Sequence, residues 1–423
     1  MIRDSVKIDW EKKQIVSNLP MRGKETEFLS QNRDIALRVL DQQCIRYSKD
    51  ADTRAAVAKA FKKLLDNGQM ALFKDLTEKE KSIISSKEVS HYLVWRVVFK
   101  ESLSSPSRVV FDGSQKTKLR EDGSGGRCLN DAIVKGRVTT LNLVKMVLKF
   151  SVGKVAVQGD LRSFYASIKL VPEQWNLQRI LFKENLDPDA EVQEAVIKTL
   201  IWGVKSVSAQ SECAIIKLAE AIQETNPRLA DMLLNGRFVD DLGDSEDNID
   251  ALKSTIDDAS KLFSSVGLEC KGWSFTGANP PPDVCEDGDL VSIGGMKWNP
   301  MHDLLEVPVP KLHFSKKVRG KLVVGTQIFE GSMHEELDKF VPELLTRRMI
   351  FSKKASIFDI LGKFVPIDTK LKLDLRKAVQ LTQGWDDPVP PELRSKWVNN
   401  FWMIEKLRGI RFKRAKMPEN ALD

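Results

Sequence analysis

Short strand-like runs alternate irregularly with amphipathic helical patterns along this chain, and this order limits the fold more than any other feature. Residues 154–161, KVAVQGDL, have the composition of a short, largely buried strand. Residues 92–99 and 107–114 hold two runs of β-branched and aromatic residues with a turn between them. No internal repeat is evident. The irregular interleaving therefore predicts an α+β fold.

Apolar residues at helical spacing predict the main helices. One helix is expected after Ser30 and another after Asp52, because apolar side chains form a single stripe in each. A third helix follows the acidic stretch at 238–241. Ser245 can cap its start and Gly267 can end it.

The length and the composition limit the class of protein. A chain of 423 residues is too long for one compact core, so two to four subdomains are expected. Five scattered cysteines without a C-x-x-C motif and only four histidines argue against a disulfide frame and a structural zinc site. No run approaches the roughly 18–20 apolar residues that a membrane span needs. The first ten residues lack the apolar core of a signal peptide, so secretion is not expected.

Positive charge is concentrated in the C-terminal part of the sequence. The formal net charge is +7, and residues 346–423 hold 17 Lys and Arg against 9 Asp and Glu, a net of +8. A basic region on a nearly neutral body suggests a polyanionic partner, most simply nucleic acid. Lys413, Arg414 and Lys416 would contact its phosphates. A solvated lysine-rich face explains the same charge equally well.

The acidic pair in FVDD, residues 238–241, could hold a metal ion together with a third carboxylate. Transfer of a nucleotide to a primer uses two Mg²⁺ ions roughly 3.5–4 Å apart, held by carboxylates on rigid elements. Asp160 ends the predicted strand at 154–161, and Asp240 and Asp241 lie at the bend of a predicted hairpin. On these residues alone, the pair could also be a solvated acidic turn and Asp160 a helix N-cap.

Seven segments follow one another along the chain: SRVVFDGS, CLND, QGDLRSFYASIKL, WGVKSVSAQ, FVDD, VGLECKGW and SIGGMKWNP. In this order they resemble the motifs of a reverse transcriptase, and the nearest pattern is that of the BEL/Pao long-terminal-repeat retrotransposons. The resemblance spans about residues 15–415 and continues into SKKASIFDILGKFVPI and WDDPVPPELRSKW.

The resemblance implies a right-hand polymerase with fingers, a palm built on an antiparallel sheet, and a thumb. Residues 1–150 would form an N-terminal helical segment and the fingers. Residues 151–300 would form the palm, with a finger insertion at about 171–202. Residues 301–423 would form the thumb and a basic region similar to a connection domain. The implied activity is RNA-directed DNA polymerisation, with two Mg²⁺ ions, or Mn²⁺, an RNA or DNA template with its primer, and dNTPs.

The resemblance also assigns roles at the centre of the site. Asp160, Asp240 and Asp241 would be the metal ligands. Lys271 would be the general acid for the departing pyrophosphate. Tyr165, five residues after Asp160, would lie under the sugar, where its ring would clash with a 2′ hydroxyl and so select deoxynucleotides.

Further roles fall on residues around that centre. Arg108 would grip the triphosphate, since a guanidinium makes bidentate contacts with phosphate oxygens. Asp112 and Asn130 would order the fingers, next to nucleotide and template. Gly203 would allow a close approach of the backbone and the template. Gly294, Met296 and Trp298 would lie where the primer is gripped, and Lys413 and Arg414 would contact primer and template.

Some features differ from the family's usual pattern. Phe238 stands where a tyrosine is usual, WGVKSVSAQ lacks the usual Ser-Pro, and CKGW has one residue more than the usual KW. No acidic set for an RNase H site, no zinc set of an integrase and no D-[ST]-G of an aspartic protease is evident. The expectation is a polymerase segment of a longer Pol polyprotein, or a truncated genomic copy, in cytoplasmic virus-like particles or in the nucleus.

Two other functions remain open. A catalytically inactive, nucleic-acid-binding remnant of a retroelement would use mainly the basic region at 346–423. An RNA-dependent RNA polymerase would use the same three carboxylates, but it would need a small or hydrogen-bonding residue in place of Tyr165.

Overall fold

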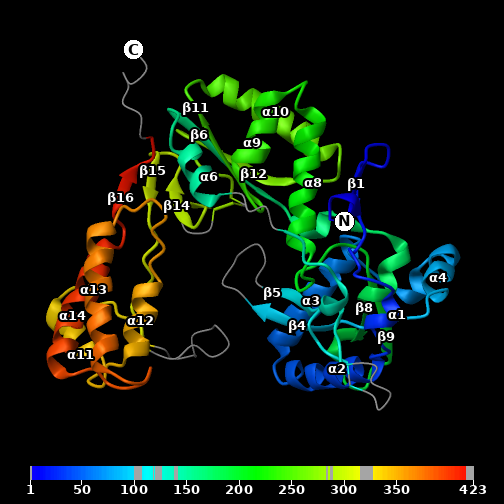
Figure 1. Cartoon of the computed structure of the whole chain (residues 1–423), viewed down its shortest axis with the longest axis horizontal. Coiled ribbons are helices and arrows are strands. Elements are labelled where there is room, and N and C mark those ends of the chain that lie inside the picture. Colours follow the sequence, from blue (N-terminus) through cyan, green and yellow to red (C-terminus); the bar gives the residue numbers. More distant parts are fainter. Residues whose placement is uncertain are drawn as a thin grey trace.

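The computed structural model describes residues 2–99, 107–117, 119, 126–137, 142–282, 284–285, 289–314 and 327–415. Its architecture is α+β with several small sheets, as the sequence predicts. Figure 1 shows three groups of elements: an N-terminal group (2–137 with 168–204), a central group (142–167 with 205–306) and a C-terminal group (307–415). None of the described helices combines the length and the apolar character that a membrane crossing requires.

The N-terminal group begins with helices where the apolar stripes predict them. α2 spans Arg33–Tyr47 and α3 spans Ala51–Asp66, and the Asp50 carboxylate caps α3 by accepting the Thr53 N–H at 2.8 Å. Three small sheets, ordered β1-β2-β7, β3-β9-β8 and β4-β5, belong to this group. α2 packs against β4 and β8, and α3 packs against β3 and β5. The remaining elements are α1 (Glu25–Phe28), α4 (Glu78–Ser85), α5 (Leu129–Ala132), β1 (Val6–Asp9), β2 (Gln14–Ser17), β3 (Met70–Leu72), β4 (Val94–Phe99), β5 (Ser107–Asp112), β7 (Lys169–Leu170), β8 (Arg179–Lys183) and β9 (Val192–Ile197).

The central group is built on a four-stranded antiparallel sheet in the order β10-β11-β6-β12. Helices pack with this sheet (Figure 1), which keeps the largely apolar strand β6 out of water. The elements are β6 (Val155–Leu161), β10 (Arg237–Phe238), β11 (Asp241–Glu246), β12 (Cys270–Phe275), α6 (Leu143–Phe150), α7 (Phe164–Ser167), α8 (Val207–Ile222), α9 (Pro227–Asn235) and α10 (Ile249–Ser264).

The start of α10 differs from the sequence prediction. Ser245 does not cap the helix, because β11 continues through it and pairs Ser245 with Ala156 of β6. Asn248 is the cap, and its side-chain oxygen accepts the N–H groups of Asp250 and Ala251. Strand pairing therefore takes precedence over the local capping signal at Ser245.

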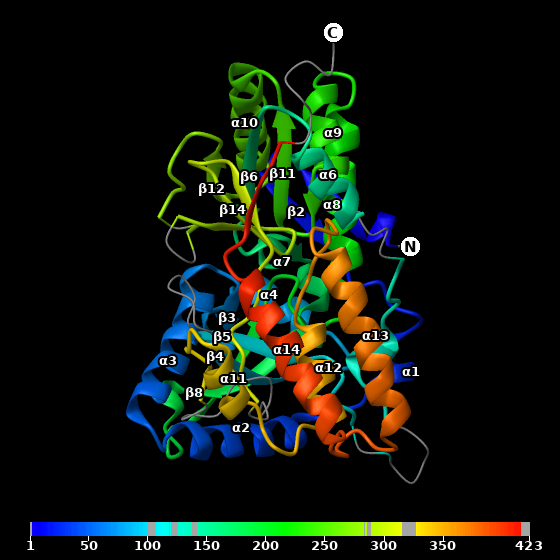
Figure 2. The ribbon, with the colours of Figure 1, turned by 90° about the vertical axis from the view of Figure 1, so that its left-hand side faces the viewer.

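The C-terminal group is helical and is joined to the central group through a second small sheet. That sheet has the order β13-β14-β15-β16, so the last described strand pairs with strands that precede residue 307. Figure 2 shows α13 and α14 side by side at the front of the view, with α12 behind them. The strands of the second sheet are β13 (Val291–Ile293), β14 (Met296–Asn299), β15 (Leu304–Glu306) and β16 (Arg411–Lys413). The helices of the C-terminal group are α11 (His334–Phe340), α12 (Arg347–Ala355), α13 (Val365–Leu381) and α14 (Pro391–Leu407).

Three hydrophobic clusters stabilise these groups. The largest is shared by the N-terminal and central groups, and a second fills the space among the C-terminal helices around Trp397 and Phe401. The third lies between α6 and the β13–β15 strands, where the Phe150 and Trp298 rings meet edge to face with centroids 5.0 Å apart. This third cluster positions the β13–β14 hairpin against the central sheet.

Candidate active site

The central sheet brings the three predicted metal-binding aspartates to one end. Asp160 is the second-last residue of β6, and Asp241 is the first residue of β11. The antiparallel register makes them direct partners. Asp240 lies in the two-residue turn between β10 and β11, and its carbonyl accepts the Leu161 N–H at 2.9 Å. The three side chains therefore start from adjacent backbone positions.

The turn that presents Asp240 has an unusual backbone conformation. Val239 has φ +57°, in the left-handed region that β-branched residues rarely adopt. A positive φ at the first of two loop residues is typical of a type II′ hairpin turn, where glycine is the usual residue. Strain of this kind persists only where the surroundings enforce it, and it is common at functional sites.

The buried Arg237 side chain holds this turn in place. Its side chain is 1% exposed, and it donates hydrogen bonds to the Val239 carbonyl at 2.7 Å and to Glu212 of α8 at 2.8 Å. Glu212 is itself 8% exposed. The buried ion pair therefore links α8 to the carbonyl group that precedes Asp240.

The charges at the end of the sheet interact strongly. Burial raises the pKa of Asp241 to about 7, and the nearby charges of Asp240 and Asp160 contribute to that rise. The Gly294 N–H donates a weak hydrogen bond to Asp241 at 3.4 Å. The Lys271 ammonium lies 2.7 Å from a carboxylate oxygen of Asp160. Lys271 thus supplies the positive charge beside Asp160 in this structure.

The oxygen donors of this site suit Mg²⁺ or Mn²⁺, but the carboxylates are not placed to hold an ion in this structure. Asp160, Asp240 and Asp241 offer hard oxygen donors, which Mg²⁺ prefers. A divalent cation would also offset the mutual repulsion that raises the pKa of Asp241. Within the described residues, however, no group of three or more His, Cys, Asp or Glu is arranged to hold a metal ion. Binding would require the three carboxylates to converge further and Lys271 to move away from Asp160.

Tyr165 is held between α8 and an exposed indole. Its ring is 6% exposed, and its hydroxyl lies 3.0 Å from the Ser208 hydroxyl of α8. The Trp202 ring, 56% exposed, lies 4.3 Å from the Tyr165 ring, centroid to centroid. Burial raises the pKa of the phenol, and the charge of Asp240 adds to this effect. Sequence reasoning did not select Trp202 or Ser208, although the aromatic residue directly before Gly203 was a usable signal.

Asn130 and Gly203 connect the N-terminal group to this region. The Asn130 amide donates to the Gly203 carbonyl at 2.9 Å and accepts the Lys205 N–H at 2.8 Å. Gly203 has φ +104°, and a Cβ there would lie 2.0 Å from the Phe111 carbonyl oxygen. The close approach that requires glycine is therefore to the chain's own strand β5. The predicted approach of a template to Gly203 stays a prediction.

Arg108 and Asp112 lie on β5. Both side chains are exposed, and Asp112 accepts the Ser114 N–H at 2.8 Å. Arg108 is thus accessible to a phosphate, and Asp112 orders the turn that follows the strand.

The β13–β14 hairpin meets Asp241 through its turn. Met296 is 1% exposed and Trp298 is fully buried, because both side chains face the third hydrophobic cluster. Neither side chain is therefore accessible to a primer in this structure.

The position of Arg414 contradicts its predicted role as a phosphate contact. Its side chain is fully buried. It forms a two-bond pair with Asp303 at 2.6 and 2.9 Å and donates to the carbonyls of Phe150, Gly153 and Lys154. These contacts are all within the chain and keep the guanidinium buried, so it cannot reach a nucleic acid. Lys413 is exposed at the end of β16, and Lys416 lies outside the described residues.

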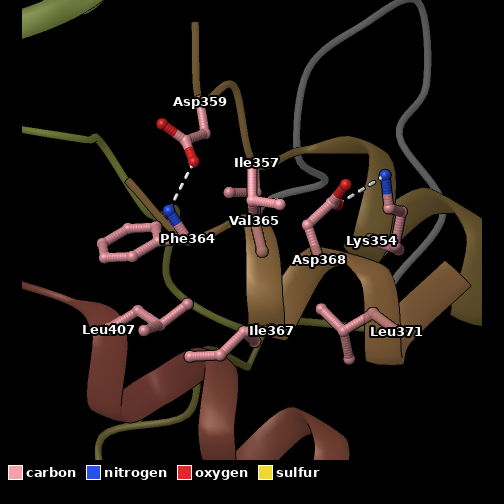
Figure 3. A pocket seen from close by; sticks show the side chains of 9 residues that line it. All are labelled: Lys354, Ile357, Asp359, Phe364, Val365, Ile367, Asp368, Leu371 and Leu407. Carbon is pink, nitrogen blue, oxygen red and sulfur yellow. Dashed lines mark hydrogen bonds and ion pairs between the residues drawn. The ribbon is translucent and has the colours of Figure 1, made fainter. Parts of the chain in front are cut away.

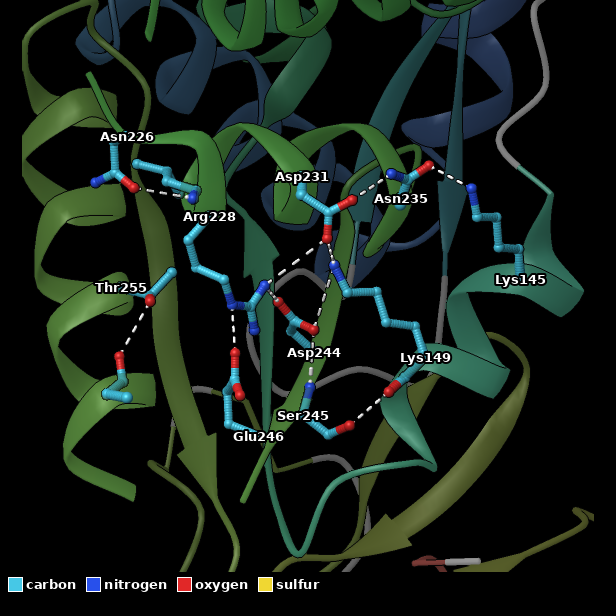
Figure 4. Close-up of polar contacts among 12 residues, drawn as sticks. Lys145, Lys149, Asn226, Arg228, Asp231, Asn235, Asp244, Ser245, Glu246 and Thr255 are labelled. Atoms are coloured by element: carbon cyan, nitrogen blue, oxygen red, sulfur yellow. Dashed lines mark hydrogen bonds and ion pairs between the residues drawn. The ribbon is translucent and has the colours of Figure 1, made fainter. Parts of the chain in front are cut away.

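A polar network fixes the far end of β11 (Figure 4). Asp244 is fully buried and pairs with Arg228 at 2.6 Å and with Lys149 at 3.6 Å. Arg228 also pairs with Glu246. Two cations from α6 and α9 thus balance the buried carboxylate, which would be costly to leave unpaired. The network holds the strand that begins with Asp241.

The comparison with known families concerns the C-terminal part of the chain. Residues 346–422 match the family described as the Pao retrotransposon-like RNaseH-like domain. This segment contains α12, α13, α14 and β16, which the sequence analysis expected to belong to a thumb and a basic connection-like region. No curated protein matches the chain. The match supports a Pol segment of a BEL/Pao retrotransposon and, with it, a relation to nucleic-acid-processing enzymes.

Proposed function

We propose that this chain is an RNA-directed DNA polymerase segment of a BEL/Pao retrotransposon. The observation that supports it best is the register of the central sheet, in which Asp241 directly opposes Asp160 and Asp240 lies in the adjoining turn. In this proposal residues 1–150 form an N-terminal helical segment and the fingers, with an insertion at about 171–202. Residues 151–300 form the palm, and residues 301–423 form the thumb and a basic region similar to a connection domain. The family match at 346–422 supports the retrotransposon origin and leaves the activity to experiment.

The proposed roles follow from the positions of the side chains. Asp160, Asp240 and Asp241 would hold two Mg²⁺ ions, which would activate the primer hydroxyl and neutralise charge on the phosphates. Lys271, which pairs with Asp160 at 2.7 Å in this structure, would donate a proton to the leaving pyrophosphate after moving away from Asp160. Exposed Arg108 would bind the triphosphate. Tyr165 would close the floor beneath the sugar.

Primer extension tests the proposal directly. The purified chain should extend oligo-dT on poly-rA with dTTP when Mg²⁺ or Mn²⁺ is present, and a chelator should stop the reaction. Template–primer binding without extension would support the inactive, nucleic-acid-binding remnant. Equally efficient extension with UTP would support an RNA polymerase.

Replacement of Tyr165 by valine should weaken sugar discrimination. Fitting an extra heavy atom into a packed site costs about 1–3 kcal/mol, which corresponds to roughly ten- to hundredfold at about 1.4 kcal/mol per decade. Tyr165→Val should therefore improve UTP incorporation relative to dTTP by roughly that factor. Single-nucleotide incorporation on poly-rA measures this ratio.

Tyr165→Phe is the matched control. It keeps the ring and removes only the hydroxyl that contacts Ser208, so discrimination should stay near that of the parent. An unchanged ratio in Tyr165→Val would make Tyr165 a core aromatic residue and would remove its role as a gate.

A further inference from the structure

Among the described residues of the C-terminal group, a small cavity and a larger hollow differ in charge. The smaller cavity, about 140 Å³, contains two carboxylates and one ammonium, and Lys354 and Asp368 are paired there at 2.8 Å (Figure 3). The larger hollow is an open groove of about 510 Å³ along α13 and α14. Its charged lining residues are Lys370, Asp374, Arg376, Lys377 and Lys396. Four cations against one carboxylate give this groove, which we call the α13/α14 groove, a net charge of +3.

The single carboxylate lies at the floor of the groove and orders two of the cations. Asp374 is 3% exposed and pairs with Lys396 at 2.6 Å and with Lys370 at 3.4 Å. The Asn400 amide of α14 also donates to it at 3.0 Å. The negative charge is therefore covered, and the ammonium groups stand between it and solvent. An approaching anion would meet the cations first.

The cations are spread along the groove. Lys370 and Lys377 are seven residues apart on α13, about 10.5 Å along the helix axis at about 1.5 Å per residue. Arg376 is exposed on the same helix, and Lys396 approaches from α14. This distance is longer than one phosphate group, so it suits a chain of phosphates better than a single small anion.

The groove lies away from the candidate active site. α13 and α14 form the outer flank of the C-terminal group, with α12 behind them (Figure 2). The three aspartates are on the central sheet, which lies above this flank in Figure 1. A strand that occupies the groove would therefore be outside the region around Asp160 and Asp241.

We propose that the α13/α14 groove binds the phosphate backbone of a nucleic-acid strand without reading its sequence. Charge complementarity supports this occupant, since a set of Lys and Arg that neutralises phosphates releases counterions. The proposal needs no catalytic step. It also assigns the nucleic-acid contact of the basic C-terminal region to side chains other than the buried Arg414.

The test is a double variant, Arg376→Gln with Lys377→Gln. It leaves Lys370 and Lys396 in place, because these two side chains balance buried Asp374. Binding of a labelled mixed-sequence DNA duplex is measured by fluorescence anisotropy over a series of salt concentrations. The slope of log K against log salt should become shallower by about 1.8, at about 0.9 for each lost phosphate contact.

The control is Lys253→Gln with Lys261→Gln, the same change of charge on exposed positions of α10. This variant should keep the parent slope. An unchanged slope in the groove variant, or an equal change in the control, would overturn the proposal. So would weaker binding of a polyglutamate peptide with unchanged binding of DNA, because the groove would then be a site for acidic protein.

The test is also independent of the proposed polymerase activity. The change in slope should be the same in a chain that carries Asp240→Asn, with no dNTP present. If primer extension fails and the slope still changes, only the polymerase assignment is refuted. If extension succeeds and the slope does not change, only the proposed binding of nucleic acid by the α13/α14 groove is refuted.

Discussion

Replacing Asp240 by asparagine should reduce primer extension by roughly 10³- to 10⁵-fold, by analogy with catalytic groups that act as a unit. Asparagine keeps the size of the side chain but lacks the charge that a divalent cation requires. The position of Asp240, in the turn between β10 and β11 beside the Asp160–Asp241 pair, makes it a shared neighbour of both carboxylates. Single-turnover extension of oligo-dT on poly-rA measures the loss.

Asp257→Asn is the matched control, because Asp257 is exposed on α10. It should extend the primer at the parent rate. Mn²⁺ binding, followed by the electron paramagnetic resonance signal of the free ion, should weaken in Asp240→Asn and not in Asp257→Asn. Extension by Asp240→Asn at close to the parent rate would end the polymerase assignment.

Replacing Arg237 by methionine should lower the free energy of unfolding by about 3–5 kcal/mol, the cost of leaving one partner of a buried ion pair alone. Buried Glu212 would lose its cationic partner, and the Val239 carbonyl would lose its donor. Urea denaturation measures the change. Arg33→Met is the control, because its pair with Glu194 is half exposed and should contribute about 0–1 kcal/mol.

A double variant separates stability from the geometry of the turn. Arg237→Met with Glu212→Met removes both charges, and such replacements are often neutral or stabilising. Its stability should recover towards that of the parent. Its extension rate should stay low, because nothing then holds the Val239 carbonyl that precedes Asp240. A full recovery of both the stability and the extension rate would mean that Arg237 has no positioning role.

The parts of the fold that depend on local periodicity could be predicted from the sequence. The strand predicted at 154–161 is β6, Val155–Leu161, and the helices predicted after Ser30 and Asp52 are α2 and α3. The backbone register places Asp160 opposite Asp241, and the convergence of their carboxylates stays a prediction. The roles assigned to these residues remain predictions.

The rest depends on contacts between distant residues, which no local pattern reveals. Arginine side chains are usually exposed, and nothing in the neighbouring sequence marks Arg237 or Arg414 as buried. Each is buried, because a carboxylate from elsewhere meets it: Glu212 of α8 for the first and Asp303 for the second. The same is true of the left-handed Val239, whose conformation is fixed by Arg237 and not by its own preference.

The strand β16 has a mechanical consequence for the whole molecule. It pairs with β15, which pairs with β14, and the turn before β14 holds the Gly294 N–H that meets Asp241. A cut at residue 345 would leave β15 with an open edge, which is prone to aggregation, and would strip Asp303 of Arg414. Residues 346–415 are thus connected to the central group through this sheet. A tilt of α12–α14 would strain the backbone hydrogen bonds from β16 to β14 and, through the β13–β14 turn, the contact between the Gly294 N–H and Asp241.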